Sequence, residues 1–169
     1  MLNIRKRTAV VATVFIFWGN CPPVMAEPVV PEVVIVVSPL DSFKEAKALT
    51  KVELKELLKA VGFEGKALKT AWAVAMKESN GRPVAHNGNS DTGDNSYGVF
   101  QINMIGSLGE DRREKFNLAS NTDLFDPVTN AEIAFHMTNG GKDWSSWKIY
   151  PNQTNSERYE SYLKAFPKD

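Results

Sequence analysis

The stretch ALKTAWAVAMKES, residues 67–79, decides the fold. From Ala67 to Met76 it is apolar on nearly every side. A helix that is hydrophobic all round lies in the core of a protein, and the run Gly81-Arg82-Pro83 behind it is typical of a helix stop. The sequence therefore predicts a buried central helix over about residues 65–80.

Helical signals continue on both sides of this segment. Thr50 and Glu53 form a capping-box pattern ahead of an apolar face that ends at Gly62 and consists of Val52, Leu54, Leu57, Leu58 and Val61. Asp126 followed by Pro127 predicts a further helix start, and a last helix is expected over about 156–165. The polar residues 85–97 suit a long loop or a poor β-hairpin. We therefore expect a mainly α domain of α+β type, with a small irregular or hairpin region beside the central helix.

Composition excludes several classes of protein. The chain has 169 residues, 43% of them hydrophobic, with 20 basic and 20 acidic side chains, which suits one globular domain and argues against a strongly basic nucleic-acid binder. A single cysteine excludes an intramolecular disulfide. With only His86 and His136 beside it, neither a metal site nor a cofactor is expected.

The N-terminus has the pattern of an export signal. Arg5-Lys6-Arg7 precedes an apolar run to Trp18, and small residues stand at Val24 and Ala26. We predict a signal peptide over 1–26, an extended arm or linker over 27–40, and the folded domain over 41–169, located in the periplasm or outside the cell. Cleavage would leave 17 basic and 20 acidic side chains and no cysteine. An uncleaved anchor or a lipid on Cys21 are the alternatives.

Glu78 is the candidate for chemistry. It lies in the last turn of the most apolar helix, where outward-pointing carbonyls carry partial negative charge. Burial and this helix end both favour the protonated carboxyl group, and a protonated acid near neutral pH is what general-acid cleavage of a glycosidic bond requires. Position alone is also compatible with a solvated residue at a helix end.

Three short motifs, in order along the chain, resemble signatures of the lysozyme-like superfamily, which includes soluble lytic transglycosylases, goose-type lysozymes and many phage muramidases. They are Ala75-Met-Lys-Glu-Ser79, Tyr97-Gly-Val-Phe-Gln-Ile-Asn103 and Asp126-Pro-Val-Thr-Asn-Ala131. The resemblance covers roughly residues 49–150. It implies the α+β lysozyme-like fold and an enzyme that acts on peptidoglycan glycan strands.

Carried over residue by residue, the resemblance makes Glu78 the catalytic acid, with Ser79 orienting it through a hydroxyl hydrogen bond. Gly98 would let a saccharide approach the backbone, Gln101 would bind substrate or tie down its loop, and Asn130 would face the cleft. The full set of predicted substrate-binding residues is Ser79, Tyr97, Gly98, Phe100, Gln101, Asn130, Trp144 and Tyr150. Trp144 could instead pack in the core.

A second acid is missing from its usual places. Animal-type lysozymes carry an aspartate directly before the Tyr-Gly pair, where this chain has Ser96, and goose-type enzymes use a position that is Asn103 here. Asp91 and Asp94 remain, either as a second acid or as turn caps.

The resemblance therefore favours a lytic transglycosylase that cleaves the MurNAc-GlcNAc β-1,4 bond and leaves 1,6-anhydro-MurNAc ends. A hydrolytic lysozyme and a non-catalytic peptidoglycan-binding module are the alternatives. We expect a monomer that binds no nucleic acid, and an envelope-spanning secretion or conjugation assembly is a candidate partner.

Overall fold

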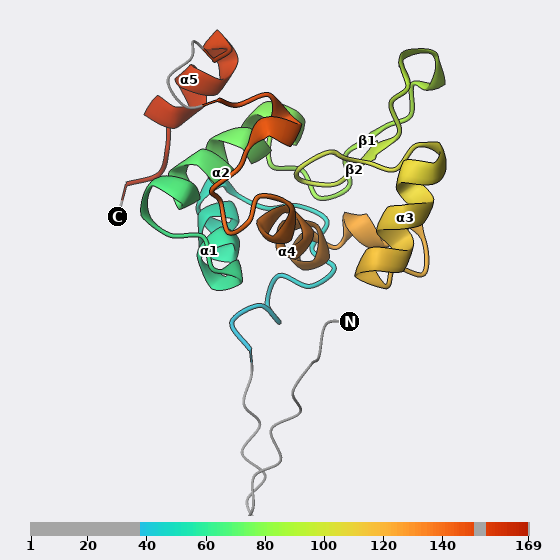
Figure 1. Cartoon of the computed structure of the whole chain (residues 1–169). Helices are drawn as coiled ribbons and strands as arrows, with labels where there is room; N and C mark the ends of the chain where they lie inside the picture. The colour runs from blue at the N-terminus through green and yellow to red at the C-terminus, as the bar shows by residue number, and fades with distance from the viewer. Residues whose placement is uncertain (1–37, 151–154, 169) are drawn as a thin grey trace, which may run out of the picture. The chain divides into compact units, whose positions relative to one another are not determined.

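The computed structural model describes residues 38–150 and 155–168. The predicted signal peptide and all but the last three residues of the predicted arm lie outside these ranges. In the described part of the chain, no helix is long and apolar enough to cross a membrane. The elements, labelled in part in Figure 1, are α1 (Lys51–Val61), α2 (Gly65–Ser79), β1 (His86–Asn87), η1 (Ser90–Thr92), β2 (Ser96–Tyr97), β3 (Ile102–Asn103), α3 (Gly106–Phe116), η2 (Asn121–Phe125), α4 (Pro127–Met137), η3 (Ser145–Trp147) and α5 (Glu157–Lys164).

Helix α2 is the buried central helix that the sequence predicts. Residues 71–76 are almost inaccessible to solvent, and the helix packs against both α1 and α5. The Trp72 indole N–H donates to the Lys51 carbonyl at 3.0 Å. Asn80 ends the helix in the left-handed conformation, with φ of 58°. The mainly helical α+β architecture is therefore confirmed.

Helix α1 begins and ends as predicted. The Glu53 N–H donates to Thr50 Oγ1 at 3.1 Å and the Thr50 N–H donates to Glu53 Oε2 at 2.7 Å, which completes the capping box. Its buried face contains Leu54, Leu57 and Leu58. Val52 was expected on that face but is 59% exposed, because residues two apart on a helix do not point the same way.

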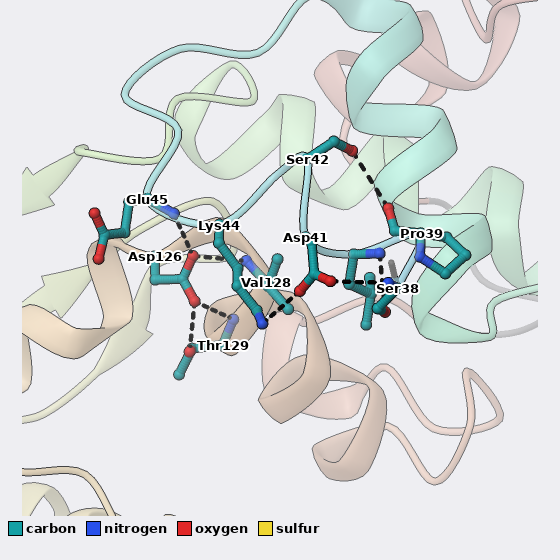
Figure 2. A network of polar contacts seen from close by, with 10 residues as sticks. Ser38, Pro39, Asp41, Ser42, Lys44, Glu45, Asp126, Val128 and Thr129 are labelled. Carbon is teal, nitrogen blue, oxygen red and sulfur yellow. Dashed lines mark hydrogen bonds and ion pairs between the residues drawn. The ribbon is translucent and has the colours of Figure 1, made fainter. Parts of the chain in front are cut away.

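The start of α4 also ties down the segment that precedes α1. Asp126 caps the helix by accepting from the backbone N–H groups of Val128 and Thr129, as predicted, and its Oδ1 also accepts from the Glu45 N–H at 2.9 Å. Figure 2 shows this carboxylate between the two segments, with the ion pair of Lys44 and Asp41 beside it.

The polar region forms a small antiparallel sheet in the order β1-β2-β3, in which Ser96 pairs with Asn87 on one side and with Asn103 on the other. It agrees with the hairpin alternative. Helix α3 was not predicted, because it has no apolar stripe and begins with two glycines in four residues. Gly109 is required there, since a Cβ atom would lie 2.2 Å from the Met104 carbonyl oxygen.

Candidate functional site

Glu78 lies in the last turn of α2 with its side chain 23% exposed. Its Oε1 accepts a hydrogen bond from Lys77 Nζ at 2.8 Å, and the same ammonium donates to the Trp147 carbonyl at 3.2 Å. Sequence reasoning did not single out Lys77. Its adjacency to the acid was the available signal, but neighbours on a helix do not normally face each other.

Ser79 is buried, and its hydroxyl does not make the predicted hydrogen bond to Glu78. Its hydroxyl contacts the Val99 carbonyl at 2.7 Å and the Ala75 carbonyl at 3.2 Å, and it accepts from the Arg82 N–H at 3.1 Å. The hydroxyl therefore joins the end of α2 to the turn that follows β2. Ser79 fixes the backbone beside the acid rather than the carboxyl group itself.

Asn130 on α4 is fully buried and faces the backbone of that same turn rather than a cleft. Its Oδ1 accepts from the Phe100 N–H at 2.9 Å. Its Nδ2 donates to the carbonyls of Tyr97 and Leu124, each at 3.0 Å. The prediction that Asn130 faces substrate is therefore wrong, because its polar atoms satisfy backbone groups that the fold has removed from water.

Position 98 requires glycine because the backbone of this turn lies close to Asn130 and Leu124. Gly98 has φ of 76°, and a Cβ atom would lie 2.2 Å from both Asn130 Nδ2 and the Leu124 carbonyl oxygen. The close approach that glycine permits is thus to α4 and η2 of the protein itself. The expected approach of a saccharide is not needed to explain this residue.

Gln101 is used to hold the loop, the second of its two predicted roles. It adopts φ of 48°, and its Nε2 donates to the carbonyls of Ala85 at 3.1 Å and Gly98 at 3.0 Å. Both amide hydrogens are therefore engaged by backbone. A hydrogen bond to substrate would have to use the Oε1 atom.

Phe100 and Trp144 lie in the core and not on a cleft wall. Both are buried, and their ring centroids are 6.4 Å apart in a cluster with Phe63 and Trp147. The indole N–H of Trp144 donates to the Gly141 carbonyl and that of Trp147 to the Phe100 carbonyl, at 2.9 and 2.8 Å. This cluster contacts the turn from the side of the core. It agrees with the alternative that Trp144 packs in the core.

Two predicted aromatic residues are more accessible. Tyr97 is half-buried on β2, with the His86 ring centroid 4.5 Å away and that of Phe125 5.4 Å away. Tyr150 is 40% exposed, and its backbone N–H donates to Asn155 Oδ1. Solvent therefore reaches these two residues more than it reaches Phe100 and Trp144, and their substrate-binding role stays a prediction.

The two hairpin carboxylates differ in their surroundings. Asp94 Oδ2 accepts from Asn87 Nδ2 at 2.5 Å, and its Oδ1 accepts from the Ser96 hydroxyl. Asp91 is exposed on η1, where its backbone N–H donates to Asn89 Oδ1 at 3.1 Å. Asp94 is thus part of the hairpin's hydrogen-bond network, whereas Asp91 lies at its exposed end. Asn103 ties the same loop through its side chain to the Gly93 carbonyl.

A surface pocket between α3 and the end of α4 includes none of these residues. Several of the predicted site residues instead meet where α2 ends against the turn after β2. There, the structure joins Ser79, Gly98, Gln101 and Asn130 through hydrogen bonds and close contacts, with Glu78 and Lys77 directly alongside in sequence.

The sequence is similar to those of known proteins. A family model described as a lysozyme-like domain matches residues 55–149, more than half of the chain. Lysozyme C, milk isozyme, of Equus caballus is 29% identical over 124 residues, which span 69% of this chain and 96% of the relative. Lysozyme C of Equus asinus matches with the same identity and coverage. No solved structure matches.

Proposed function

Because the chain belongs to the lysozyme-like domain family, we propose that it is a peptidoglycan lytic transglycosylase with Glu78 as its catalytic acid and base. Family membership supports a glycosidase acting on peptidoglycan. The choice of the transglycosylase reaction is the narrower step, and it depends on how many carboxylates the site supplies.

In this reaction, Glu78 donates its proton to the glycosidic oxygen between MurNAc and GlcNAc, and the C1–oxygen bond breaks. The C6 hydroxyl of the same MurNAc then attacks C1 and gives its proton to the Glu78 carboxylate. The product has a 1,6-anhydro-MurNAc end, and the acid is regenerated without an external water. One carboxyl group at the end of α2 suffices for both proton transfers.

The hydrogen bonding of Asp94 carries this choice. A hydrolase of the two-carboxylate kind needs a second acid at a defined separation from the first, and Ser96 occupies the position directly before the Tyr-Gly pair. The nearest aspartate along the strand, Asp94, has each oxygen bonded within the hairpin, to Asn87 and to Ser96. That pattern suits turn stabilisation and supports a mechanism with one glutamate.

A hydrolytic lysozyme is the second candidate, favoured by the names of the two equine relatives. In that case a water would replace the C6 hydroxyl as the attacking group. Asp94 would then be the group to activate it, with Ser96 holding the carboxylate in place.

Product analysis separates the two reactions. Purified peptidoglycan is digested with the protein, and the released muropeptides are weighed by mass spectrometry. Anhydro ends, lighter by one water than reducing ends, are expected. Free reducing ends as the main product would contradict the transglycosylase proposal and favour the hydrolase.

The assignment of Glu78 is tested by the isosteric variant Glu78→Gln. The amide cannot donate an acidic proton, so the rate is expected to fall by at least about a hundredfold. Glu64→Gln is the matched control, because Glu64 is an exposed glutamate at the other end of α2 whose side chain makes no capping hydrogen bond. Wall clearance by Glu78→Gln at the rate of the control would refute the enzyme assignment.

A further inference from the structure

Lys77 and Glu78 form an unusual pair for adjacent helical residues. Neighbours on an α-helix point about 100° apart, yet Lys77 Nζ lies 2.8 Å from Glu78 Oε1. The two side chains are 22% and 23% exposed, so the pair is largely shielded from water. Ion pairs of this kind are screened less by salt than pairs on an open surface.

The ammonium is held from its other side by a rigid part of the protein. Lys77 Nζ donates to the Trp147 carbonyl at 3.2 Å. Trp147 is itself buried in the aromatic cluster, and its indole N–H donates to the Phe100 carbonyl. The position of the ammonium is therefore set by η3 and the turn after β2, not by the solvent.

We infer that Lys77 is a positioning residue that fixes the Glu78 carboxyl group through Oε1 and directs its acidic proton to Oε2. This inference rests on the proposed function. An ammonium group has three donors and no acceptor. The carboxyl oxygen that faces it must accept, so the proton of the neutral acid is carried by the other oxygen.

The same contact acts during the proposed reaction. When Oε2 gives its proton to the glycosidic oxygen, negative charge forms on a carboxylate whose Oε1 is already bonded to the ammonium. Lys77 stabilises that carboxylate and holds Oε2 in place to take the proton of the C6 hydroxyl. It acts through Glu78, so it contributes to turnover rather than to substrate affinity.

The test compares Lys77→Met, which keeps an unbranched apolar stem, with Lys77→Arg, which keeps a cation. For Lys77→Met, kcat is expected to fall about tenfold with KM unchanged within about twofold. Lys77→Arg should restore most of kcat, because it keeps a cationic donor for Oε1.

Lys59→Met is the matched control, since Lys59 pairs with Glu56 on an exposed face of α1. It should leave both kcat and KM unchanged. Thermal unfolding of each variant gives the folded fraction, and kcat is expressed per folded protein.

The outcomes separate the two proposals. If Lys77→Met keeps the original kcat per folded protein while Glu78→Gln is inactive, the role of Lys77 is overturned and the proposed function stands. If Lys77→Arg loses as much kcat per folded protein as Lys77→Met, the role is likewise overturned. If Glu78→Gln remains active, the proposed function itself fails.

Discussion

The turn over residues 97–101 and the hairpin over residues 86–96 are adjacent in sequence but are held in different ways. Buried side chains from elsewhere bond the turn's backbone, namely Ser79 from α2 and Asn130 from α4. The hairpin is largely exposed and is held by bonds between its own side chains, such as Asn87 with Asp94. Most of the motif residues therefore build the site's support, and few can reach a substrate.

The largest loss of stability is expected from Asn130→Ala, which removes the support of the turn. The variant leaves the Phe100 N–H and the Tyr97 and Leu124 carbonyls without their buried partner. Each unpaired group costs about 1–3 kcal/mol, so the free energy of unfolding is expected to fall by about 3–5 kcal/mol. Urea denaturation measures it. Glu132→Ala, at an exposed position of the same helix, should change it by less than about 0.5 kcal/mol.

Gly98→Ala tests whether Asn130 is the reason for glycine at this position. The added Cβ would collide with Asn130 Nδ2 and with the Leu124 carbonyl oxygen, so the single variant should also be strongly destabilised. In the Asn130→Ala background one of these collisions is gone. The double variant should therefore lose less stability than the sum of the two single losses, by about 1 kcal/mol or more. A loss equal to that sum would contradict this explanation.

A smaller effect is expected from Asp126→Ala at the start of α4, the helix that carries Asn130. The variant removes the cap on Val128 and Thr129 and the bond to the Glu45 N–H seen in Figure 2. Loss of an N-cap costs about 1–2 kcal/mol. Asp126→Asn should recover part of that stability, because asparagine is an equally good cap but has one side-chain oxygen, whereas both oxygens of Asp126 accept. An equal loss in both variants would show that the complete carboxylate, and not a single capping oxygen, is what matters.

Local signals explain which parts of the fold were predictable. Three such signals involve only residues that are close together in the sequence, so a single sequence shows them. They are the apolar run of α2, the capping box at Thr50 and the Asp126-Pro127 pair. Helix α3 carries no such signal. Its residues follow no apolar period, and contacts such as that of Gly109 with Met104 become visible only in three dimensions.

The candidate site shows the same limit. Its motifs could be found in the sequence, but the directions in which their side chains point could not be predicted. Asn130 and Phe100 are 30 residues apart, and nothing in the pattern shows that the amide bonds the backbone of the turn. Lys77 was missed for a related reason, since its contact with Glu78 depends on the Trp147 carbonyl 70 residues later.

The smallest effect is expected from a variant in the hairpin. This variant tests most directly whether the hairpin only stabilises the fold. Asp94→Asn keeps a side-chain oxygen that can accept from Asn87 or Ser96 but loses the other acceptor. Because Asp94 is only half-buried and Asn87 is exposed, the free energy of unfolding should fall by only about 1 kcal/mol. The fraction of anhydro ends and the rate should match those of Asp91→Asn, at the exposed end of the hairpin. A loss of about a hundredfold in rate for Asp94→Asn alone would make Asp94 a reacting group, and the hairpin would then belong to the chemistry rather than to the support.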